Sequence, residues 1–361
     1  MKRTWNHQTL PLALCLGVGL LIAGCGEPIH ERAAALPTLA GEQVVEWPLV
    51  VTHGGAGSPP DWMPDCQAAA DSGLTALQLH ATALATAVRS TMVLEDIPRF
   101  NAGTGANIRL DGRTIQMDAA VMTSAGEFAA VAVIERVRNP VAVARAVLDT
   151  PHRLLAGEGA TRFAHRAGFA DLVPTCPEAE AKYRVRIERL LAGEAGGGYD
   201  TFDWRAYWNY ETEPPISQQI QDEPDLPEIS DTVGSVVRDA NGNFAATLST
   251  GGTSITLNGR VGDVPIYGCG CFAGPAGAVA CTGFGEEIIR HAMARGVYDL
   301  LAQGFSARDA VQQSCAGFPP EYSLGLIAVG KSGWGVAANR DMAYGIATAD
   351  ISDDTAGSFA H

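Results

Sequence analysis

The segment Ser230-Asp231-Thr232-Val233-Gly234-Ser235-Val236-Val237 marks the point where an ordered sheet is expected to begin. The acidic, proline-rich run Asp222-Glu223-Pro224-Asp225-Leu226-Pro227-Glu228-Ile229 precedes it. After it, Val233 to Val237 and Phe244 to Leu248 are typical of two strands joined by a tight turn. Thr232 is therefore predicted to lie between a segment that is easily cleaved and an ordered hairpin.

A threonine in this place can become a new N-terminus. If the Asp231–Thr232 bond is cut, the Thr232 hydroxyl serves as nucleophile and its own α-amine accepts the proton. The reference pKa of an α-amine is roughly 7.7–8.0, which is close to the working pH that a general base needs. Threonine also suits strands for structural reasons, so this dipeptide alone does not identify a nucleophile.

Composition limits the class of protein. The chain has 361 residues, of which 47% are hydrophobic and 18% charged, and this is ordinary for one large globular domain or two small ones. A formal charge of −15 argues against a nucleic-acid partner, which would favour a basic surface.

The N-terminus has the pattern of an export signal. Lys2 and Arg3 precede the apolar run Leu12 to Ala23, which is shorter than the roughly 20 residues of a spanning helix. Small residues before Cys25 fit a signal-peptide cleavage site, and the pattern resembles the lipobox of bacterial lipoproteins. We expect residues 1–24 to be removed, Cys25 to carry lipid, and residues 25–45 to form a tether. An ordinary signal peptide or an uncleaved anchor is the alternative.

By resemblance to lipoprotein sorting, Gly26 permits the outer membrane. The expected location is therefore the periplasmic face of a bacterial membrane, with contact only through the lipid anchor. Six cysteines remain after Cys15 and Cys25, namely Cys66, Cys176, Cys269, Cys271, Cys281 and Cys315. Disulfide pairing cannot be deduced from sequence, and buried free thiols are favoured for most of them. No spacing of Cys or His indicates zinc.

The N-terminal half alternates strands and helices. Trp47 to Thr52 predicts a buried strand that leads into the glycine-rich segment His53-Gly54-Gly55-Ala56-Gly57. Apolar residues recur at spacings of three and four between Cys66 and Met92, which predicts one amphipathic helix. A loop of small residues follows at 99–106. The other elements expected here are strands over 115–122 and 129–134 and a helix from Asn139, its cap, through Leu148.

The C-terminal half begins with an acidic linker over about 170–231, which contains a helix over 179–191 and the aromatic residues Trp204, Tyr207, Trp208 and Tyr210. After the hairpin we expect a helix over 286–302, a shorter helix after Ser306, and strands over 324–329, 334–338 and 343–346. This order predicts an α+β fold with two sheets packed face to face and helices outside.

Seven segments occur in one order along the chain: His53-Gly54-Gly55-Ala56-Gly57, Phe100-Asn101-Ala102-Gly103-Thr104-Gly105, Met117-Asp118-Ala119, Asp231-Thr232-Val233-Gly234, Ser249-Thr250-Gly251-Gly252, Gly259-Arg260-Val261-Gly262-Asp263 and Thr282-Gly283-Phe284-Gly285-Glu286. Together they resemble the isoaspartyl peptidase/L-asparaginase family, often called plant-type asparaginases. The resemblance covers roughly residues 46–350 apart from the acidic linker. It implies an N-terminal-nucleophile hydrolase with a four-layer αββα sandwich.

The resemblance also implies self-cleavage between Asp231 and Thr232. Residues 46–231 would form an α subunit with the acidic linker at its end, and residues 232–361 a β subunit, both contributing to one catalytic domain. Members of the family suggest a dimer of such αβ heterodimers.

Site roles follow from the same resemblance. Thr232 matches the nucleophile and base, Thr250 the threonine that hydrogen-bonds the nucleophile, and Asn101 an asparagine beside it. The Thr282 side chain and the Gly283 N–H match an oxyanion hole. Substrate binding would use Arg260 for the α-carboxylate, Asp263 for the α-ammonium, and Gly285. The carbonyls of Leu94, Glu95, Ile97, Phe100, Ala102 and Thr104 match a sodium-binding loop, and no catalytic cofactor is implied.

Each residue taken singly has a structural explanation. Arg260 and Asp263 could form a solvated turn contact, Thr250 could be a strand hydroxyl, and Asn101 could be a turn former. Phe284 departs from the family pattern, in which a small, polar or histidine residue is usual, so the preferred leaving group stays open.

The expected reaction is hydrolysis of L-asparagine or of β-aspartyl dipeptides through an acyl-enzyme on Thr232. Glycosylasparaginase is the close alternative, although His-Gly-Gly-Ala-Gly and Thr-Gly-x-Gly-Glu favour the asparaginase branch. The sequence also permits a threonine endopeptidase of the same superfamily, or a non-catalytic surface lipoprotein with the same fold.

Overall fold

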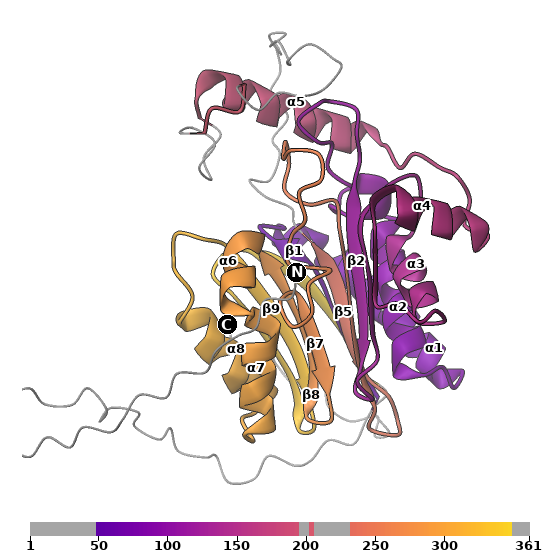
Figure 1. Ribbon diagram of the computed structural model, residues 1–361. Coiled ribbons are helices and arrows are strands. Elements are labelled where there is room, and N and C mark those ends of the chain that lie inside the picture. The colour runs from indigo at the N-terminus through magenta and orange to yellow at the C-terminus, as the bar shows by residue number, and fades with distance from the viewer. Residues whose placement is uncertain (1–47, 195–201, 206–231, 349–361) are drawn as a thin grey trace, which may run out of the picture. The chain divides into compact units, whose positions relative to one another are not determined.

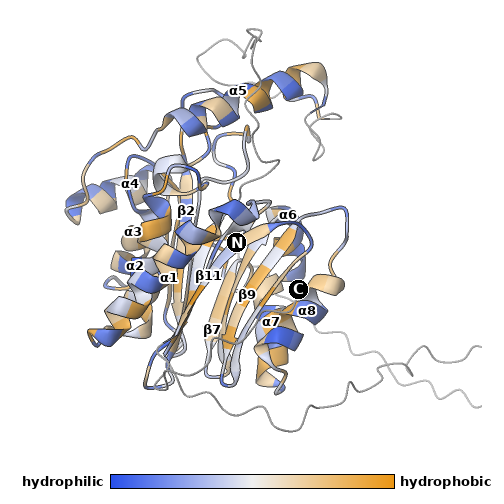
Figure 2. Cartoon of the chain, turned by 180° about the vertical axis from the view of Figure 1, so that it is seen from behind, coloured by the Kyte–Doolittle hydropathy of each residue, from blue (hydrophilic) through white to orange (hydrophobic). Residues whose placement is uncertain are grey.

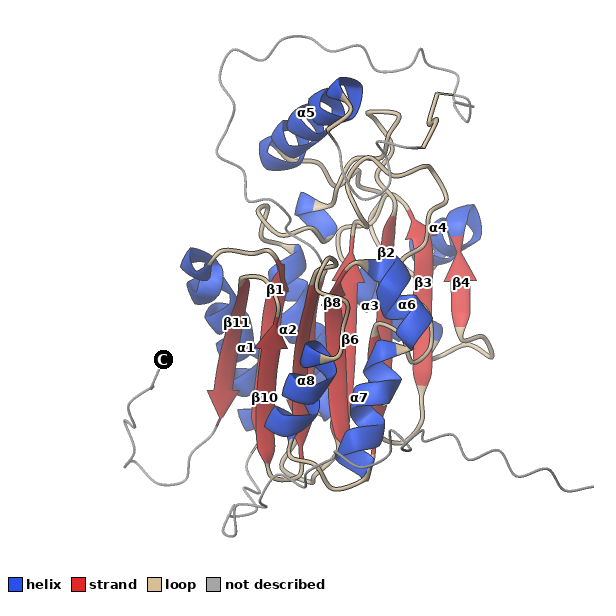
Figure 3. Cartoon of the chain, turned by 90° about the vertical axis from the view of Figure 1, so that its left-hand side faces the viewer, coloured by secondary structure: helices blue, strands red, loops and turns tan. Residues whose placement is uncertain are grey.

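The larger of two sheets runs through the centre of the molecule. The computed structural model describes residues 48–194, 202–205 and 232–348 (Figure 1). The seven strands of this sheet lie in the order β11-β1-β5-β6-β2-β3-β4 (Figure 3). They are β1 (Leu49–Ala56), β2 (Met117–Thr123), β3 (Phe128–Ile134), β4 (Leu154–Ala156), β5 (Val233–Arg238), β6 (Phe244–Thr250) and β11 (Met342–Thr348). All neighbours are antiparallel except β3 and β4, and β5 with β6 confirms the predicted hairpin.

A second sheet has four antiparallel strands in the order β10-β9-β8-β7. They are β7 (Cys271–Gly274), β8 (Gly277–Gly283), β9 (Leu324–Gly330) and β10 (Gly333–Ala338). The largest apolar cluster lies between the sheets, since it joins Ala246 and Leu248 of β6 to Ala280 of β8 and Leu326 of β9. In Figure 2, β7 and β9 are coloured mainly as hydrophobic, as expected for strands with a buried inner face.

The helices outside the acidic linker lie on the outer sides of these sheets (Figure 1). On the seven-stranded sheet pack α1 (Met63–Gln78), α2 (Ala83–Glu95), α3 (Pro140–Val147) and α4 (Gly157–Arg166). On the four-stranded sheet pack α7 (Met293–Ala302) and α8 (Ala307–Ala316), preceded by α6 (Gly285–His291). The predicted α+β class is confirmed. Within the described ranges, no helix is long and apolar enough to span a bilayer.

Two predicted helices are each broken in two. The helix expected over 66–92 ends at Gln78, because His80 adopts a positive φ of 63° and Thr82 then caps α2 by accepting from the Ala85 amide. The helix expected over 286–302 breaks at Ala292, whose φ is 43°. The spacing of apolar residues continues through both breaks, so periodicity alone could not reveal them.

Helix caps also differ from expectation. Asn139 precedes α3 as predicted, but its side chain makes no capping bond and instead donates to Asp96 at 3.0 Å. In the acidic linker, the expected helix is α5 (Pro177–Ala192), which begins two residues early because the Cys176 thiol accepts from the Ala179 amide.

The described part of the linker packs on the domain. Trp204 is buried with Leu110, Ile187, Leu190 and Ile255. Tyr207, Trp208, Tyr210 and Asp231 lie outside the described residues, as do the predicted signal segment, Cys25 and the tether.

The six cysteines of the described ranges are free thiols, and all but the half-buried Cys315 are buried. This agrees with the prediction of buried thiols. Burial raises the pKa of each thiol, to about 12 for Cys271.

Candidate active site

Three polar residues form a row across the seven-stranded sheet. Val233 pairs with Ser249 in the antiparallel ladder, so one further step in register sets Thr232 opposite Thr250. On the other side of Thr250, Asp118 of β2 is its direct partner. Residues directly opposite each other project from the same face of a sheet, and this face is the one that carries Ala246 and Leu248 into the core between the sheets. Thr232, Thr250 and Asp118 therefore lie at one edge of that apolar core.

The Thr250 hydroxyl is oriented by the turn that follows it. Its Oγ1 accepts from the Gly252 amide at 2.9 Å, which leaves the hydroxyl proton to be donated elsewhere. Asn101 holds the same turn, because its Nδ2 donates to the Gly252 carbonyl at 2.7 Å and its backbone carbonyl accepts from the Gly251 amide at 3.0 Å. The structure thus brings Asn101 beside Thr250, both of them buried.

Thr282 is the last residue but one of β8 and contacts the larger sheet at Ala56. Its Oγ1 accepts from the Ala56 amide at 3.1 Å, so its proton is likewise available for donation. The β1–β5 pairing ends at His53 with Gly234, and Ala56 lies three residues further along β1, so Thr282 contacts the same end of β1 at which His53 meets the Thr232 backbone. Gly283 follows with a φ of 133°, and a side-chain carbon there would lie 2.1 Å from the Ser323 carbonyl oxygen. Only glycine fits.

His53 is a buried neighbour of Thr232 that was not predicted as a site residue. Burial lowers the pKa of its imidazole to about 3, and contact with the Thr232 backbone opposes this only in part. His53 pairs with Gly234, where a side-chain carbon would lie 2.7 Å from its Nε2. The ring is therefore neutral at physiological pH. Its presence in the glycine-rich segment was the only sequence signal for it.

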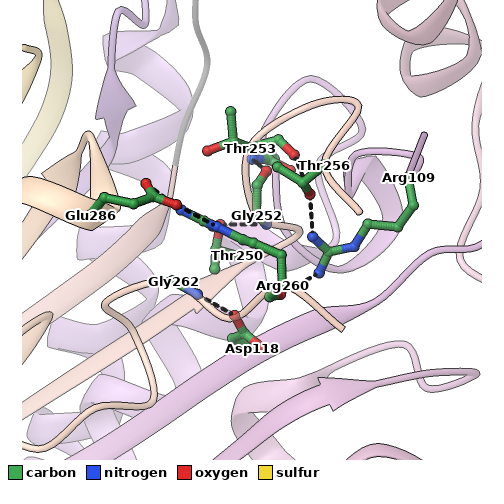
Figure 4. A network of polar contacts seen from close by, with 10 residues as sticks. Arg109, Asp118, Thr250, Gly252, Thr253, Thr256, Arg260, Gly262 and Glu286 are labelled. Carbon is green, nitrogen blue, oxygen red and sulfur yellow. Dashed lines mark hydrogen bonds and ion pairs between the residues drawn. The ribbon is translucent and has the colours of Figure 1, made fainter. Parts of the chain in front are cut away.

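Arg260 and Asp263 converge over Gly285. A side-chain carbon on Gly285 would lie 2.9 Å from Arg260 Nη2 and 2.9 Å from Asp263 Oδ1, so these opposite charges border one small space. Arg260 also donates from Nε to Glu286 Oε1 at 3.1 Å and from Nη2 to Glu286 Oε2 at 2.9 Å (Figure 4). Glu286, on α6, is thus a third charged residue beside this space.

Two buried charges support this loop, and neither was predicted as a site residue. The Asp118 carboxylate accepts from the Val133 amide at 2.7 Å and from the Gly262 amide at 3.3 Å. Burial raises its pKa, while the charges of Arg109 and Arg260 oppose the rise. Arg109 donates to the Arg260 carbonyl at 3.2 Å and to the Thr256 hydroxyl (Figure 4). Asp118 links the Thr250 row to the arginine loop.

Another buried carboxyl, that of Glu95, lies near the row formed by Thr232, Thr250 and Asp118. Glu95, at the end of α2, accepts from the Val141 amide at 2.9 Å and contacts the Ser249 side chain. Burial raises its pKa to about 8, and these hydrogen bonds only partly counteract that rise.

The loop predicted to bind sodium is built of turns. The carbonyls of Ile97 and Ala102 each accept one backbone amide and keep a second lone pair, whereas the Leu94 carbonyl accepts from the amides of both Asp96 and Ile97. Lys182 of α5 donates to the Gly105 carbonyl at 3.2 Å in the same loop. Backbone carbonyls of this kind fit a hard monovalent cation, so sodium stays a prediction. In the described ranges, no three Asp, Glu, His or Cys side chains group as a metal site.

Similarity to known proteins extends over most of the chain. The asparaginase family profile matches residues 46–356. A plant-type L-asparaginase from Pyrococcus abyssi (strain GE5 / Orsay) is 33% identical over 321 residues, covering 85% of this chain and 99% of the relative. An isoaspartyl peptidase from Salmonella typhimurium is 37% identical, covering 79% and 90%. A probable isoaspartyl peptidase/L-asparaginase 2 from Arabidopsis thaliana is 33% identical, covering 84% and 96%.

Proposed function

This chain belongs to the asparaginase family and is therefore a hydrolase, and from that premise we propose that it cleaves L-asparagine, β-aspartyl dipeptides or both, with Thr232 as nucleophile. One juxtaposition carries the proposal. Thr232 stands opposite Thr250 in register, and Asp118 joins that row to a loop where Arg260 and Asp263 border the same small space. This arrangement supports a single site that holds both the nucleophile and a binding pair for a zwitterion.

Maturation would precede catalysis. The Thr232 hydroxyl attacks the Asp231 carbonyl carbon, the peptide C–N bond breaks, and an ester forms while the nitrogen gains a proton. Water then hydrolyses the ester, which leaves a carboxylate on Asp231 and a free α-amine on Thr232. That amine is the base that accepts the hydroxyl proton in each later turnover.

Turnover proceeds through an acyl-enzyme. Thr232 Oγ1 attacks the side-chain amide carbon of the substrate, and the resulting oxyanion receives hydrogen bonds from the Thr282 hydroxyl and the Gly283 N–H. Because the Ala56 amide already donates to Thr282 Oγ1, the hydroxyl proton is directed to the oxyanion. Collapse releases ammonia, or the amine of a dipeptide, and water cleaves the β-aspartyl ester to give aspartate.

Arg260 and Asp263 would fix the other end of the substrate. A guanidinium fork pairs with the α-carboxylate by two parallel hydrogen bonds, and the Asp263 carboxylate accepts from the α-ammonium. Gly285 lies between them and leaves room for the α-carbon. Both charges of an amino acid are thereby matched, while its side-chain amide is left for Thr232.

We extend the proposal to the assembly. The fold would be the αββα sandwich of N-terminal-nucleophile hydrolases, with an α subunit over 46–231 and a β subunit over 232–361, as a dimer of αβ heterodimers. Sodium would bind the carbonyls of the 94–104 loop. The lipobox-like sequence supports export and a lipid on Cys25 at the outer membrane. Spheroplast fractionation and mass spectrometry of the N-terminal peptide test the last point.

The decisive experiment is intact mass with N-terminal sequencing of wild type, Thr232→Ala and Thr247→Ala. Thr247 is a buried threonine of the same strand pair and serves as the matched control. We expect wild type and the control to yield a second chain that begins Thr-Val-Gly-Ser, and Thr232→Ala to stay uncut. An uncut wild type after prolonged incubation would contradict the proposal.

Hydrolysis is then measured with L-asparagine, a β-aspartyl dipeptide and a glycosylasparagine. Release of aspartate from either of the first two by the cleaved protein supports the proposed substrates. Activity on glycosylasparagine alone would move the assignment to that class of hydrolase.

A further inference from the structure

The guanidinium of Arg260 already holds a carboxylate. Glu286 meets it with two hydrogen bonds, Nε to Oε1 at 3.1 Å and Nη2 to Oε2 at 2.9 Å, in the side-on bidentate arrangement that carboxylates prefer. Figure 4 shows the two side chains facing each other along this edge. Glu286 therefore occupies the fork in the same chemical form as a substrate α-carboxylate.

The nitrogen that Glu286 occupies is also the one that faces the substrate space. Arg260 Nη2 lies beside Gly285, and Asp263 Oδ1 lies at the same distance from that glycine. Nη1 lies instead against the backbone of Gly262, where a side-chain carbon would approach it to 2.8 Å. A zwitterion placed between Asp263 and Arg260 thus meets the edge that Glu286 holds.

We propose that Glu286 is an internal carboxylate ligand of Arg260 that the substrate α-carboxylate displaces. This inference rests on the proposed function, in which Arg260 binds that carboxylate. Glu286 is then a specificity-determining residue, since only a ligand with its own carboxylate restores the contacts that Arg260 loses when Glu286 leaves.

The charges around Arg260 favour replacement of Glu286 by the substrate carboxylate over binding of both carboxylates at once. Charged residues of the described structure near this loop include the cations Arg260 and Arg109 and the acids Asp118, Asp263 and Glu286. If Glu286 stayed in place, an incoming carboxylate would be the second anion on one guanidinium edge, and like charges at such distances repel strongly where water is scarce. If Glu286 leaves, the number of carboxylates on the fork is unchanged.

Glu286 is more exposed to solvent than Arg260, as its displacement by the substrate requires. The Arg260 side chain is only 15% exposed, whereas that of Glu286 is 52% exposed. The arginine side chain is mostly enclosed by neighbouring residues. The Glu286 side chain can rotate into solvent, where its carboxylate stays hydrated. Because the glutamate of this pair is more than half exposed, water screens the pair on that side, so displacement of Glu286 costs little binding energy.

Two variants test the exchange. Glu286→Gln removes the competing charge, and Glu158→Gln removes one charge from an exposed glutamate of α4 that lies 3.5 Å from Arg162. The measurements are the KM for L-asparagine and the calorimetric Kd for L-aspartate. We expect Glu286→Gln to lower both by about two- to fivefold, the range for removal of an exposed ion pair, and Glu158→Gln to leave both unchanged.

A substrate analogue separates exchange from a general charge effect. In 3-aminopropanamide the α-carboxylate is absent, so its turnover should respond equally to the two variants. A raised or unchanged KM for L-asparagine in Glu286→Gln, or an equal gain for the analogue, would overturn this inference alone. A cleaved wild type that hydrolyses neither L-asparagine nor a β-aspartyl dipeptide and binds no L-aspartate would overturn the proposed function and the inference with it.

Discussion

The proposed active site has two sides that are built by different means. The nucleophile side consists of strand ends and one loop residue, and its members are Thr232, Thr250, Thr282, Gly283 and Asn101. The carboxylate side consists of loop and helix residues together with Asp118 of β2, and its members are Arg109, Asp118, Arg260, Asp263 and Glu286. On the nucleophile side the groups are uncharged and buried; Thr250, Thr282 and Gly283 are held by sheet pairing, and Asn101 is held by its hydrogen bonds to the turn after Thr250. On the carboxylate side they are charged, and Glu286 is largely exposed.

The difference indicates a division of labour. A hydroxyl fixed by strand pairing cannot move unless the sheet moves, which suits groups that must meet a transition state closely. A charged side chain on a loop can exchange partners, which suits recognition and release of a zwitterion. Changes on the nucleophile side should therefore lower kcat, and changes on the carboxylate side should mainly raise KM.

The largest effect is expected for Thr250→Val. This change keeps the shape of the side chain but removes the hydroxyl that we expect to hydrogen-bond the Thr232 nucleophile, so kcat should fall about 10²–10³-fold, as for loss of one preorganised donor. KM should stay within about twofold. Steady-state kinetics of the cleaved enzyme provide the measurement.

Thr247→Val is the matched control. Thr247 is a buried threonine in the same strand whose hydroxyl contacts Thr91 Oγ1 at 2.8 Å. Both variants leave a buried polar partner unsatisfied and should lose about 1–3 kcal/mol of unfolding free energy. If Thr247→Val lowers kcat as much as Thr250→Val, stability and not position explains the loss.

The next effect is expected for Arg260→Lys on the carboxylate side. Lysine keeps the charge but loses the planar fork, so KM for L-asparagine should rise about ten- to hundredfold, the range for hydrogen bonds between charged groups. The kcat value should change less than about threefold. Arg138→Lys, at an exposed arginine that pairs with Asp96, should change neither parameter. A fall in kcat for Arg260→Lys with constant KM would contradict the proposed division of labour between the two sides.

The sequence was more informative about the nucleophile side. The Thr232 hairpin follows from alternation and turn residues, and its register sets Thr250 in place. The contacts of Arg260 could not be predicted in the same way, because Glu286 lies on another element and reaches it only through tertiary packing. Arg109 gave no signal, since no periodicity marks a buried arginine in a loop.

The helix breaks have a similar explanation. The positive φ values at His80 and Ala292 occur at exposed residues that are not glycine, so the sequence pattern passes through both positions unchanged. Asp118 lay within one of the seven ordered segments, but its role as the link between the two sides required the pairing of β2 with β6 and its bond to Gly262.

A smaller effect is expected for Glu95→Gln, which tests whether the buried Glu95 carboxyl near the nucleophile side is neutral in the folded protein. The folded pKa of Glu95 is raised to about 8 from 4.5. Because the folded pKa is raised, the contribution of Glu95 to folding stability is fully present below pH 4.5 and is lost as the pH rises through 8. The glutamine does not titrate. From about pH 5 to about pH 8, wild type should therefore lose about 1–3 kcal/mol relative to Glu95→Gln.

Urea unfolding of both proteins at several pH values measures that difference. Glu158→Gln, at an exposed glutamate, is the control and should give a curve parallel to that of wild type. Parallel curves for Glu95→Gln as well would mean that the buried carboxyl keeps one ionisation state over this range.

The smallest effect is expected for Lys182→Met, which tests whether α5 supports the nucleophile side. Lys182 donates to the Gly105 carbonyl, and Asn101 lies in the same loop. Burial lowers its pKa from 10.5 to about 8, so its contribution to stability is present above pH 10.5 and is lost as pH falls through 8. At neutral pH the burial cost and the hydrogen bond oppose each other, and the net change in stability should be under about 1 kcal/mol.

Activity is the more telling measurement for Lys182→Met. Loss of the donor loosens the loop that carries Asn101, so kcat should fall about two- to threefold with constant KM, near the lower end for one hydrogen bond. Lys182→Arg keeps a donor and should restore kcat. A change in KM would instead connect α5 to the carboxylate side through Leu110 and Ile255, which pack against it. The two outcomes distinguish support by one hydrogen bond to the Asn101 loop from support by apolar packing under the arginine loop.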